Sequence, residues 1–141
     1  MKLGTLEETI TKLKSITKKK LPVTIHYAIA VNLEQLNKKY VEYCNLREKT
    51  LSETCIRNQN GEPVLEKIIE DEKETGKYSY TYKNDEDKIK VLNKIVELSN
   101  INEEFKFHKI SLSELERCEQ DEYDSLSGAD IEAMLFMIEN E

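Results

Sequence analysis

The chain has 141 residues, of which 38% are apolar and 35% are charged, and its 28 acidic and 21 basic side chains give a net charge of −7. This length predicts a single domain over residues 1–141, with a helical N-terminal part (1–57) and a second part (58–141). The sequence has no apolar run of membrane-spanning length, no apolar leader and no C-x-x-C pair. From these features we expect a cytoplasmic protein with reduced thiols, and not a membrane-spanning, exported or disulfide-stabilised one.

The first predicted helix begins at Thr5-Leu6-Glu7-Glu8, which matches a capping box, in which the Thr hydroxyl and the Glu carboxylate each accept from a backbone N–H. Its apolar positions recur at spacings of three and four. They are Leu6, Ile10, Leu13 and Ile16. A lysine run, Lys18, Lys19 and Lys20, follows where cations complement the helix dipole, and Pro22 ends the segment.

A longer helix is predicted from about residue 24 to residue 56. Its repeating face consists of Ile25, Ile29, Leu33, Leu36, Tyr40, Tyr43 and Arg47. A helix of about 30 residues is about 45 Å long, which exceeds the diameter of a domain of this size. We therefore expect one end to project or to pair with a partner helix. Cys44 and Cys55 are expected on one face of this helix, as small thiols.

An antiparallel hairpin is predicted after residues 58–63, where Asn-Gly and Pro break the helix. Its strands are expected over residues 64–69 and 77–82, on either side of a polar loop centred on residues 73–76. Three tyrosines alternate in the second strand and form a ladder on one face: Tyr78, Tyr80 and Tyr82. This tyrosine ladder is interpreted as a packing face of the sheet, with a stacking platform for bases or rings as the alternative.

A third helix is expected to be capped by Asn84 or Asp85. Its predicted buried stripe is Ile89, Leu92, Ile95, Val96 and Leu98. Phe105 and Phe107 alternate with polar residues and predict a short strand that joins the hairpin.

Two short helices are predicted in the C-terminal part. Ser111 begins the first through a capping box, and Ser127 begins the second. The residues expected to face inward are Leu112, Leu115, Ile131, Met134, Leu135 and Ile138. The predicted fold is α+β and mostly helical, with one long helix of about 30 residues, flanking shorter helices and a small antiparallel sheet made of the hairpin plus one short strand.

Charge is unevenly distributed along the sequence, since residues 1–60 have a net charge of +5 and residues 61–141 a net charge of −12. Residues 111–141 contain one cation, Arg117, against ten carboxylates. Such a surface repels nucleic acid and attracts basic protein surfaces. The candidate partner-binding residues are Glu119, Asp121, Glu122, Asp124 and Glu132. The alternatives are a solvated acidic tail and a weak, unspecific cation site.

The lysine run is the candidate anion-binding site, with a solvated helix end as the alternative. Direct nucleic-acid binding is not expected, because no recognised nucleic-acid module accompanies these lysines. The sequence has no G-x-S-x-G, no glycine-rich phosphate loop and no H-E-x-x-H. Neither His26 nor His108 has a nearby Cys in a metal-binding or nucleophile pattern. We therefore expect no catalytic residues, no metal, no cofactor and no enzymatic activity.

Three landmarks carry a family resemblance: Lys20-Leu21-Pro22 before an apolar helix start, an I-S-L-S-x-L-E segment at residues 110–116, and an acidic terminal helix ending Met137-Ile138-Glu139-Asn140-Glu141. With them, nearly the whole chain resembles a family of small proteins of unknown function encoded by phages and prophages of low-GC Gram-positive bacteria. Residues 64–82 are longer than this resemblance implies. The family supplies no catalytic residues to carry over.

The resemblance implies a non-enzymatic phage accessory protein in the host cytoplasm that binds, stoichiometrically, a host or phage protein with a basic surface. The leading prediction is an inhibitor of a host defence or nucleic-acid-handling complex, such as a CRISPR effector. The first alternative is a virion or tail morphogenesis protein that self-associates as a homo-oligomer through its long helix. The second is a protein that sequesters a nucleotide or second messenger between the lysine run and the tyrosine ladder. No membrane partner is expected.

Overall fold

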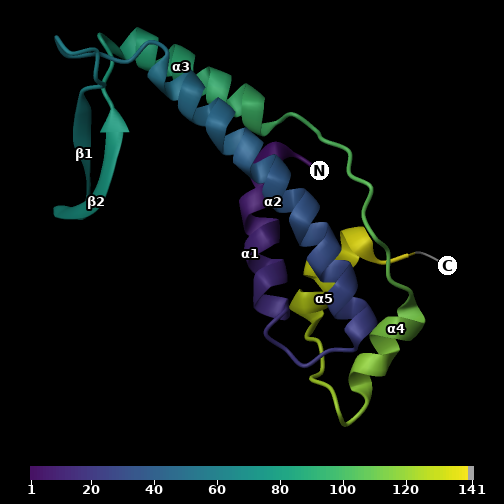
Figure 1. The fold of residues 1–141 in the computed structure, drawn as a ribbon. Coiled ribbons are helices and arrows are strands. Elements are labelled where there is room, and N and C mark those ends of the chain that lie inside the picture. Colours follow the sequence, from purple (N-terminus) through teal and green to yellow (C-terminus); the bar gives the residue numbers. More distant parts are fainter. Residues whose placement is uncertain (140–141) are drawn as a thin grey trace. The chain divides into compact units, whose positions relative to one another are not determined.

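The protein has an α+β, mostly helical fold, seen in a computed structural model that describes residues 1–139 (Figure 1). Its helices and strands are α1 (Leu6–Ile16), α2 (Val23–Ser52), β1 (Leu65–Glu70), β2 (Lys73–Tyr80), α3 (Asp85–Ser99), α4 (Leu112–Glu116) and α5 (Gly128–Met134). Short 3-10 helices occupy Leu3–Thr5, Arg117–Glu119 and Leu135–Met137. The predicted fold class and the 30-residue helix are confirmed.

Two compact units make up the structure. Unit 1 comprises Met1–Val41 and Asn102–Glu141, and unit 2 comprises Glu42–Ile101. Helix α2 begins in unit 1 and ends in unit 2, and the division expected at residues 57 and 58 falls within unit 2. The expectation of a single domain stays a prediction. Within residues 1–139, none of the helices combines the length and the apolar character that crossing a membrane requires. The last two residues of the terminal motif lie outside the described residues.

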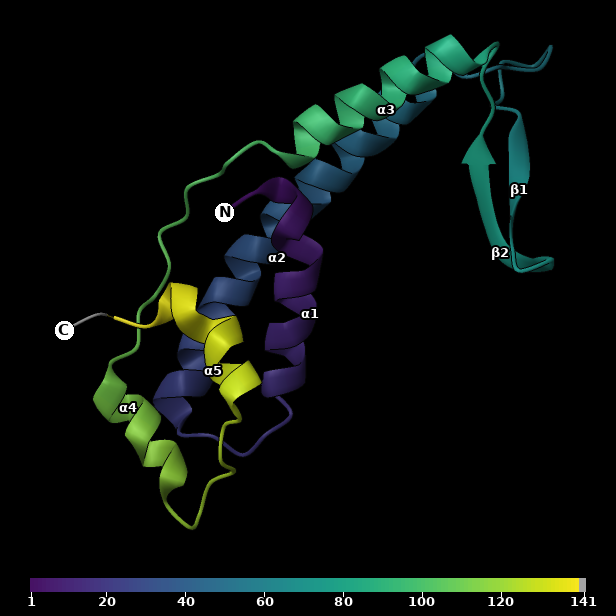
Figure 2. The same cartoon turned by 180° about the vertical axis from the view of Figure 1, so that it is seen from behind.

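The core of unit 1 is built from three parts of the chain. Helix α1 buries the whole of its predicted stripe, and α5 packs beside it in both views (Figures 1 and 2). The start of α2 and the C-terminal segment complete the core. Their buried apolar side chains include Ile25, Ala28, Ile29, Leu36, Ile110, Cys118, Met134, Met137 and Ile138. Removing such side chains from water is the main favourable contribution to folding.

The helix starts differ in how they are capped. The capping box predicted at Thr5 is absent, because a preceding 3-10 turn places Thr5 in a helical conformation and its hydroxyl donates to the Lys2 carbonyl, 2.7 Å away. Both capping-box bonds are present at Ser111 and at Ser127, where the reciprocal carboxylates are Glu114 and Asp130.

Some side chains of the C-terminal helices point outward, contrary to the prediction. Leu112, Ile131 and Leu135 are exposed, whereas Met134 and Ile138 are buried as expected. Helix α5 ends at Met134 and tightens into a 3-10 turn, which shifts the spacing and buries Met137 instead of Leu135.

Residues 101–110 form no strand, so the strand predicted at Phe105 and Phe107 is wrong. Side-chain amides of α2 make hydrogen bonds with the backbone of this segment, which in a sheet would bond to a neighbouring strand. The Asn32 amide donates to the His108 carbonyl at 2.9 Å and its oxygen accepts from the His108 N–H at 2.7 Å, while Gln35 donates to the Lys106 carbonyl at 2.9 Å. The segment is therefore held to α2 by side chains rather than by a sheet.

The sheet of unit 2 is the predicted hairpin with a different turn. The reversal lies at Asp71 and Glu72, which adopt φ values of 52° and 64°, and not at residues 73–76. Positive φ at both central residues matches the twist of a two-residue hairpin turn. Gly76, with φ of 75°, lies instead within β2. It faces the part of β1 between Lys67 and Ile69, where the register of the two strands shifts.

Helix α3 has the predicted Asn84 cap, whose side chain accepts from the Asp87 N–H, but its predicted buried stripe is only partly covered, since Ile95 and Leu98 are half-buried. Only Val91 is buried, whereas Ile89, Leu92 and Val96 are 57%, 47% and 55% exposed. The helix turns its Val91 face inward within unit 2, so the neighbouring apolar face stays in solvent. Cys55 lies beyond the end of α2, so the prediction that it shares a helix face with Cys44 is wrong.

Candidate interaction surface

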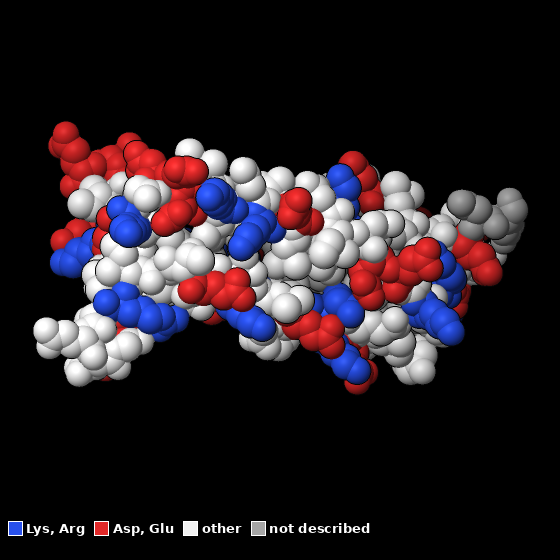
Figure 3. All heavy atoms as spheres, turned by 90° about the horizontal axis from the view of Figure 1, so that it is seen from above, with Lys and Arg blue, Asp and Glu red and all other residues white. Residues whose placement is uncertain are grey.

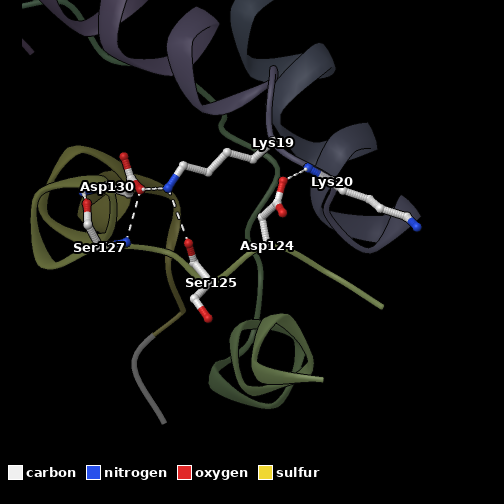
Figure 4. Close-up of polar contacts among 6 residues, drawn as sticks. All are labelled: Lys19, Lys20, Asp124, Ser125, Ser127 and Asp130. Carbon is white, nitrogen blue, oxygen red and sulfur yellow. Dashed lines mark hydrogen bonds and ion pairs between the residues drawn. The ribbon is translucent and has the colours of Figure 1, made fainter. Parts of the chain in front are cut away.

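The lysine run after α1 meets the acidic C-terminal segment within unit 1 (Figure 4). The Lys19 Nζ lies 2.7 Å from a carboxylate oxygen of Asp130 and 3.2 Å from the Ser125 carbonyl. The same Asp130 oxygen accepts from the Ser127 N–H, so one carboxylate both caps α5 and pairs with the cation. The Lys19 ammonium, followed by the Ser127 N–H, holds the pKa of Asp130 below its usual value.

Two hydrogen bonds join Lys20 and Asp124, and both involve the Lys20 backbone. The Asp124 carboxylate accepts from the Lys20 N–H at 2.7 Å, and the Asp124 N–H donates to the Lys20 carbonyl at 2.8 Å (Figure 4). The Lys20 side chain points away from this contact. One candidate anion-binding lysine, Lys19, and one candidate partner-binding carboxylate, Asp124, are thus engaged within the protein, while the side chains of Lys18 and Lys20 stay exposed.

Three of the candidate carboxylates, Glu119, Asp121 and Glu122, form what we call the acidic loop. All three are exposed, and none makes an ion pair or a side-chain hydrogen bond with residues 1–139. The loop is fixed at one end by buried Cys118 and at the other by Asp124 on Lys20. Its carboxylates are therefore presented by a tethered backbone rather than by a loose tail.

The remaining candidate, Glu132, lies in a different setting. It lines a hollow of about 530 Å³ between α1 and α5 together with Glu8, Lys12 and Asp130. Lys12 pairs with Glu8 at 2.8 Å, which lowers the pKa of Glu8 and raises the pKa of Lys12. This hollow mixes both signs of charge, so Glu132 belongs to a surface distinct from the acidic loop.

Folding cancels much of the charge asymmetry of the sequence. Residues 1–41 carry eight basic and three acidic side chains, and residues 102–141 carry three and twelve, so unit 1 has a net charge of −4. Unit 2 carries ten basic and thirteen acidic side chains, a net charge of −3. The two units are almost equally negative, and Figure 3 shows both signs interspersed on the face that it draws. The two units therefore do not differ in the sign of their net charge, although the two parts of the sequence do.

The Cys118 thiol and the His108 imidazole both pack against other parts of the protein. Cys118 is buried, and this burial, with the Glu119 carboxylate, raises the pKa of its thiol and so disfavours the reactive thiolate. The His108 ring makes an edge contact with Tyr27, with ring centroids 5.3 Å apart. Over residues 1–139, no group of three or more His, Cys, Asp and Glu side chains is arranged to hold a metal ion.

One residue that matters in unit 1 was missed in the sequence. Asn32 is fully buried between Ile29 and Leu36 on the core face of α2, and it holds the His108 backbone. The signal was present, because a lone Asn within an apolar helical stripe requires hydrogen-bond partners when it is buried. Those partners lie 76 residues away, which local spacing does not reveal.

Comparison with known proteins found no matching family model, no matching curated protein and no matching solved structure.

Proposed function

We propose that this protein is a non-enzymatic, phage-encoded accessory protein that binds one partner protein stoichiometrically through the acidic loop. The target we favour is a host defence or nucleic-acid-handling complex with a basic groove, such as a CRISPR effector. The phage origin rests on the sequence resemblance alone. The binding mode rests on the three exposed carboxylates of the acidic loop, which have no cation of their own.

The acidic loop suits this role because its backbone is already fixed. A loop that is ordered before binding loses little conformational freedom when it binds, so more of the interaction energy appears as affinity. Its unpaired negative charges also accelerate encounter with a basic surface. Asp124, included in the predicted site, contributes by anchoring the loop on Lys20 rather than by contacting the partner.

The experiment compares two triple variants with matched loss of charge. The first, Glu119→Gln with Asp121→Asn and Glu122→Gln, neutralises the acidic loop. The second, Glu70→Gln with Asp71→Asn and Glu72→Gln, neutralises three exposed, unpaired acids at the hairpin turn. Affinity-tagged proteins are used to capture the partner from host cells, and the captured protein is then titrated in purified form.

We expect the acidic-loop variant to bind about ten-fold more weakly, since each exposed ion pair contributes about 0.2–1 kcal/mol. The hairpin variant should bind like the wild type. Binding should also weaken between about 0.1 M and about 0.5 M salt, as screening increases. Equal loss in both variants, or an affinity indifferent to salt, contradicts the proposal.

Self-association of a virion or tail morphogenesis protein is the second candidate. It is favoured by Val23 and Tyr27, which lie one turn apart on α2 and are 76% and 60% exposed. Light scattering distinguishes the two: a stable homo-oligomer dissociated by Val23→Asp supports assembly, and a monomer that captures a host protein supports inhibition.

The third expectation is an anion held between the lysine run and the tyrosine ladder. The lysine run belongs to unit 1 and the tyrosine ladder to unit 2, so this site would need residues of both units.

A further inference from the structure

Unit 2 contains a hollow of about 700 Å³ that the acidic-loop proposal does not use. Its walls come from the end of α2, from both strands of the hairpin and from α3. Ligand-binding clefts in proteins measure about 300–1,000 Å³. The hollow is thus large enough to take side chains of a partner.

The charge lining this hollow is opposite to that of unit 2 as a whole. Arg47, Lys77 and Lys88 line it, are exposed, and make no ion pair with residues 1–139. The single carboxylate in its lining, Glu48, accepts a hydrogen bond from the Tyr80 hydroxyl. Three cations against one carboxylate give this lining a net charge of +2, within a unit of net charge −3, which favours an anionic occupant.

The hollow also opens onto exposed apolar surface. Leu65, Tyr78 and Leu92 line it and are 50%, 58% and 47% exposed. Ile89 and Val96 lie three residues before and four residues after Leu92, so they continue the same face of α3. From Ile89 to Val96 this apolar strip extends about 10 Å along the helix.

These features distinguish between two kinds of anionic occupant. A nucleotide is compact and does not cover a strip that continues beyond the hollow. In addition, the hydroxyls of Tyr80 and Tyr82 are bonded to Glu48 and to the Leu51 carbonyl, so these two rings form a fixed wall rather than a free stacking platform. A helix carrying apolar residues at i, i+4 and i+7 between acidic residues matches both the strip and the cations.

We propose that the hollow of unit 2 and the adjoining face of α3 bind an acidic amphipathic helix of a partner protein. This inference is independent of the acidic loop, which lies in unit 1 and selects for the opposite charge. It rests on the excess of cations in the hollow and on the exposed apolar face of α3, which adjoin at Lys88 and Leu92.

The test uses the full chain and labelled synthetic peptides of about 18 residues, which form about five helical turns. The first peptide has leucines at i, i+4 and i+7 with glutamates between them. The second has lysines in place of the glutamates, and the third has the composition of the first in scrambled order. Fluorescence anisotropy measures binding to the wild type and to the variants Lys88→Glu, Leu92→Ala and Lys94→Glu.

Lys94→Glu is the matched control, because Lys94 is an exposed, unpaired cation on another face of the same helix. We expect the acidic amphipathic peptide to bind at least about ten-fold more tightly than the other two peptides. Lys88→Glu and Leu92→Ala should each weaken its binding several-fold, and Lys94→Glu should leave it within about two-fold. Glutamate at position 88 lies in the first turns of α3, where negative charge is favourable, so this variant should fold.

Four outcomes overturn the proposal. Equal binding of the scrambled peptide reduces the site to a charge effect, and preferred binding of the lysine peptide reverses its sign. If adenosine triphosphate binds, the acidic peptide does not, and Lys88→Glu abolishes the nucleotide binding, the hollow is a site for a small anion. A homodimer seen by light scattering and dissociated by Lys88→Glu assigns it to a second copy of the chain.

Discussion

Units 1 and 2 use apolar side chains in opposite ways. Of the sixteen apolar side chains buried among residues 1–139, fifteen belong to unit 1, and Val91 alone belongs to unit 2. Of the sixteen large apolar side chains that are exposed, ten belong to unit 2. Burial is the main source of stability, and exposed apolar patches mark binding surfaces. The comparison indicates that unit 1 supplies most of the stability and that unit 2 supplies surface.

The strongest test of this comparison removes one leucine from each unit. Leu13→Ala, in the fully buried stripe of α1, should lower the free energy of unfolding by about 2–5 kcal/mol. Leu92→Ala, on the exposed face of α3, should lower it by about 0.5 kcal/mol. Urea unfolding followed by far-UV circular dichroism measures both. If the two losses were equal, unit 2 would have a cooperative core, and the contrast would be wrong.

The buried amide of Asn32 sharpens the comparison within unit 1. Asn32→Ala removes both partners of the His108 backbone, and an unsatisfied polar group costs about 1–3 kcal/mol. Asn37→Ala is the control on the same helix, because the Asn37 side chain makes no hydrogen bond with residues 1–139. We expect the first variant to lose stability and to show faster hydrogen exchange at residues 106–110. Similar exchange in both variants would show that packing and the backbone bonds between Ile110 and the C-terminal segment hold these residues without Asn32.

The Lys19–Asp130 pair gives a smaller, pH-dependent effect. Because the pKa of folded Asp130 lies below its usual value, the pair stabilises the fold above about pH 4, and this contribution is lost as the pH falls through the folded-state pKa. Asp130→Asn should therefore cost about 1 kcal/mol at neutral pH, with a difference from wild type that narrows in acid. Urea unfolding between about pH 3 and about pH 7 measures it.

Glu8→Gln is the matched control for this pair. It removes the carboxylate that pairs with Lys12, but both of these side chains are exposed, at 69% and 54%. Exposed pairs of this kind contribute little, so the control should unfold like the wild type at every pH. A pH-independent loss in Asp130→Asn would instead indicate that the negative charge of Asp130 contributes nothing to stability.

The last prediction concerns the reactivity of the three thiols, which should differ between the two units. Cys118 is buried in unit 1 with a raised pKa, whereas Cys44 and Cys55, both in unit 2, are half-buried. An aromatic disulfide reagent should label two thiols at least about ten-fold faster than the third. The slow phase should disappear in Cys118→Ser. Three equal rates would indicate that unit 1 opens as readily as unit 2.

The sequence predicted what depends on nearby residues. The stripe of α1 and most of the extent of α2 follow from spacing within one helix, and the capping box at Ser111 follows from residues three apart. The hairpin was also recognised, but its loop was centred on the polar residues 73–76. Asp71 and Glu72 form the turn instead.

What the sequence did not reveal depends on contacts between distant segments. Periodicity shows that Ile89, Leu92 and Val96 share a face of α3, but it does not show whether another element covers that face. The predicted strand at Phe105 was replaced by bonds to Asn32 and Gln35. The lysine run and the acidic segment appeared as separate sites until Lys19 and Asp130, 111 residues apart, were seen to pair.

The interrupted order of unit 1 has a consequence for how the protein is made. Its core needs side chains from both sides of the intervening residues 42–101, so α1 and the start of α2 emerge from the ribosome long before Met134 and Met137 can cover them. Contacts between such distant segments slow folding and leave apolar surface exposed meanwhile. The nascent chain should therefore need protection by chaperones until Met134 and Met137 have been synthesised.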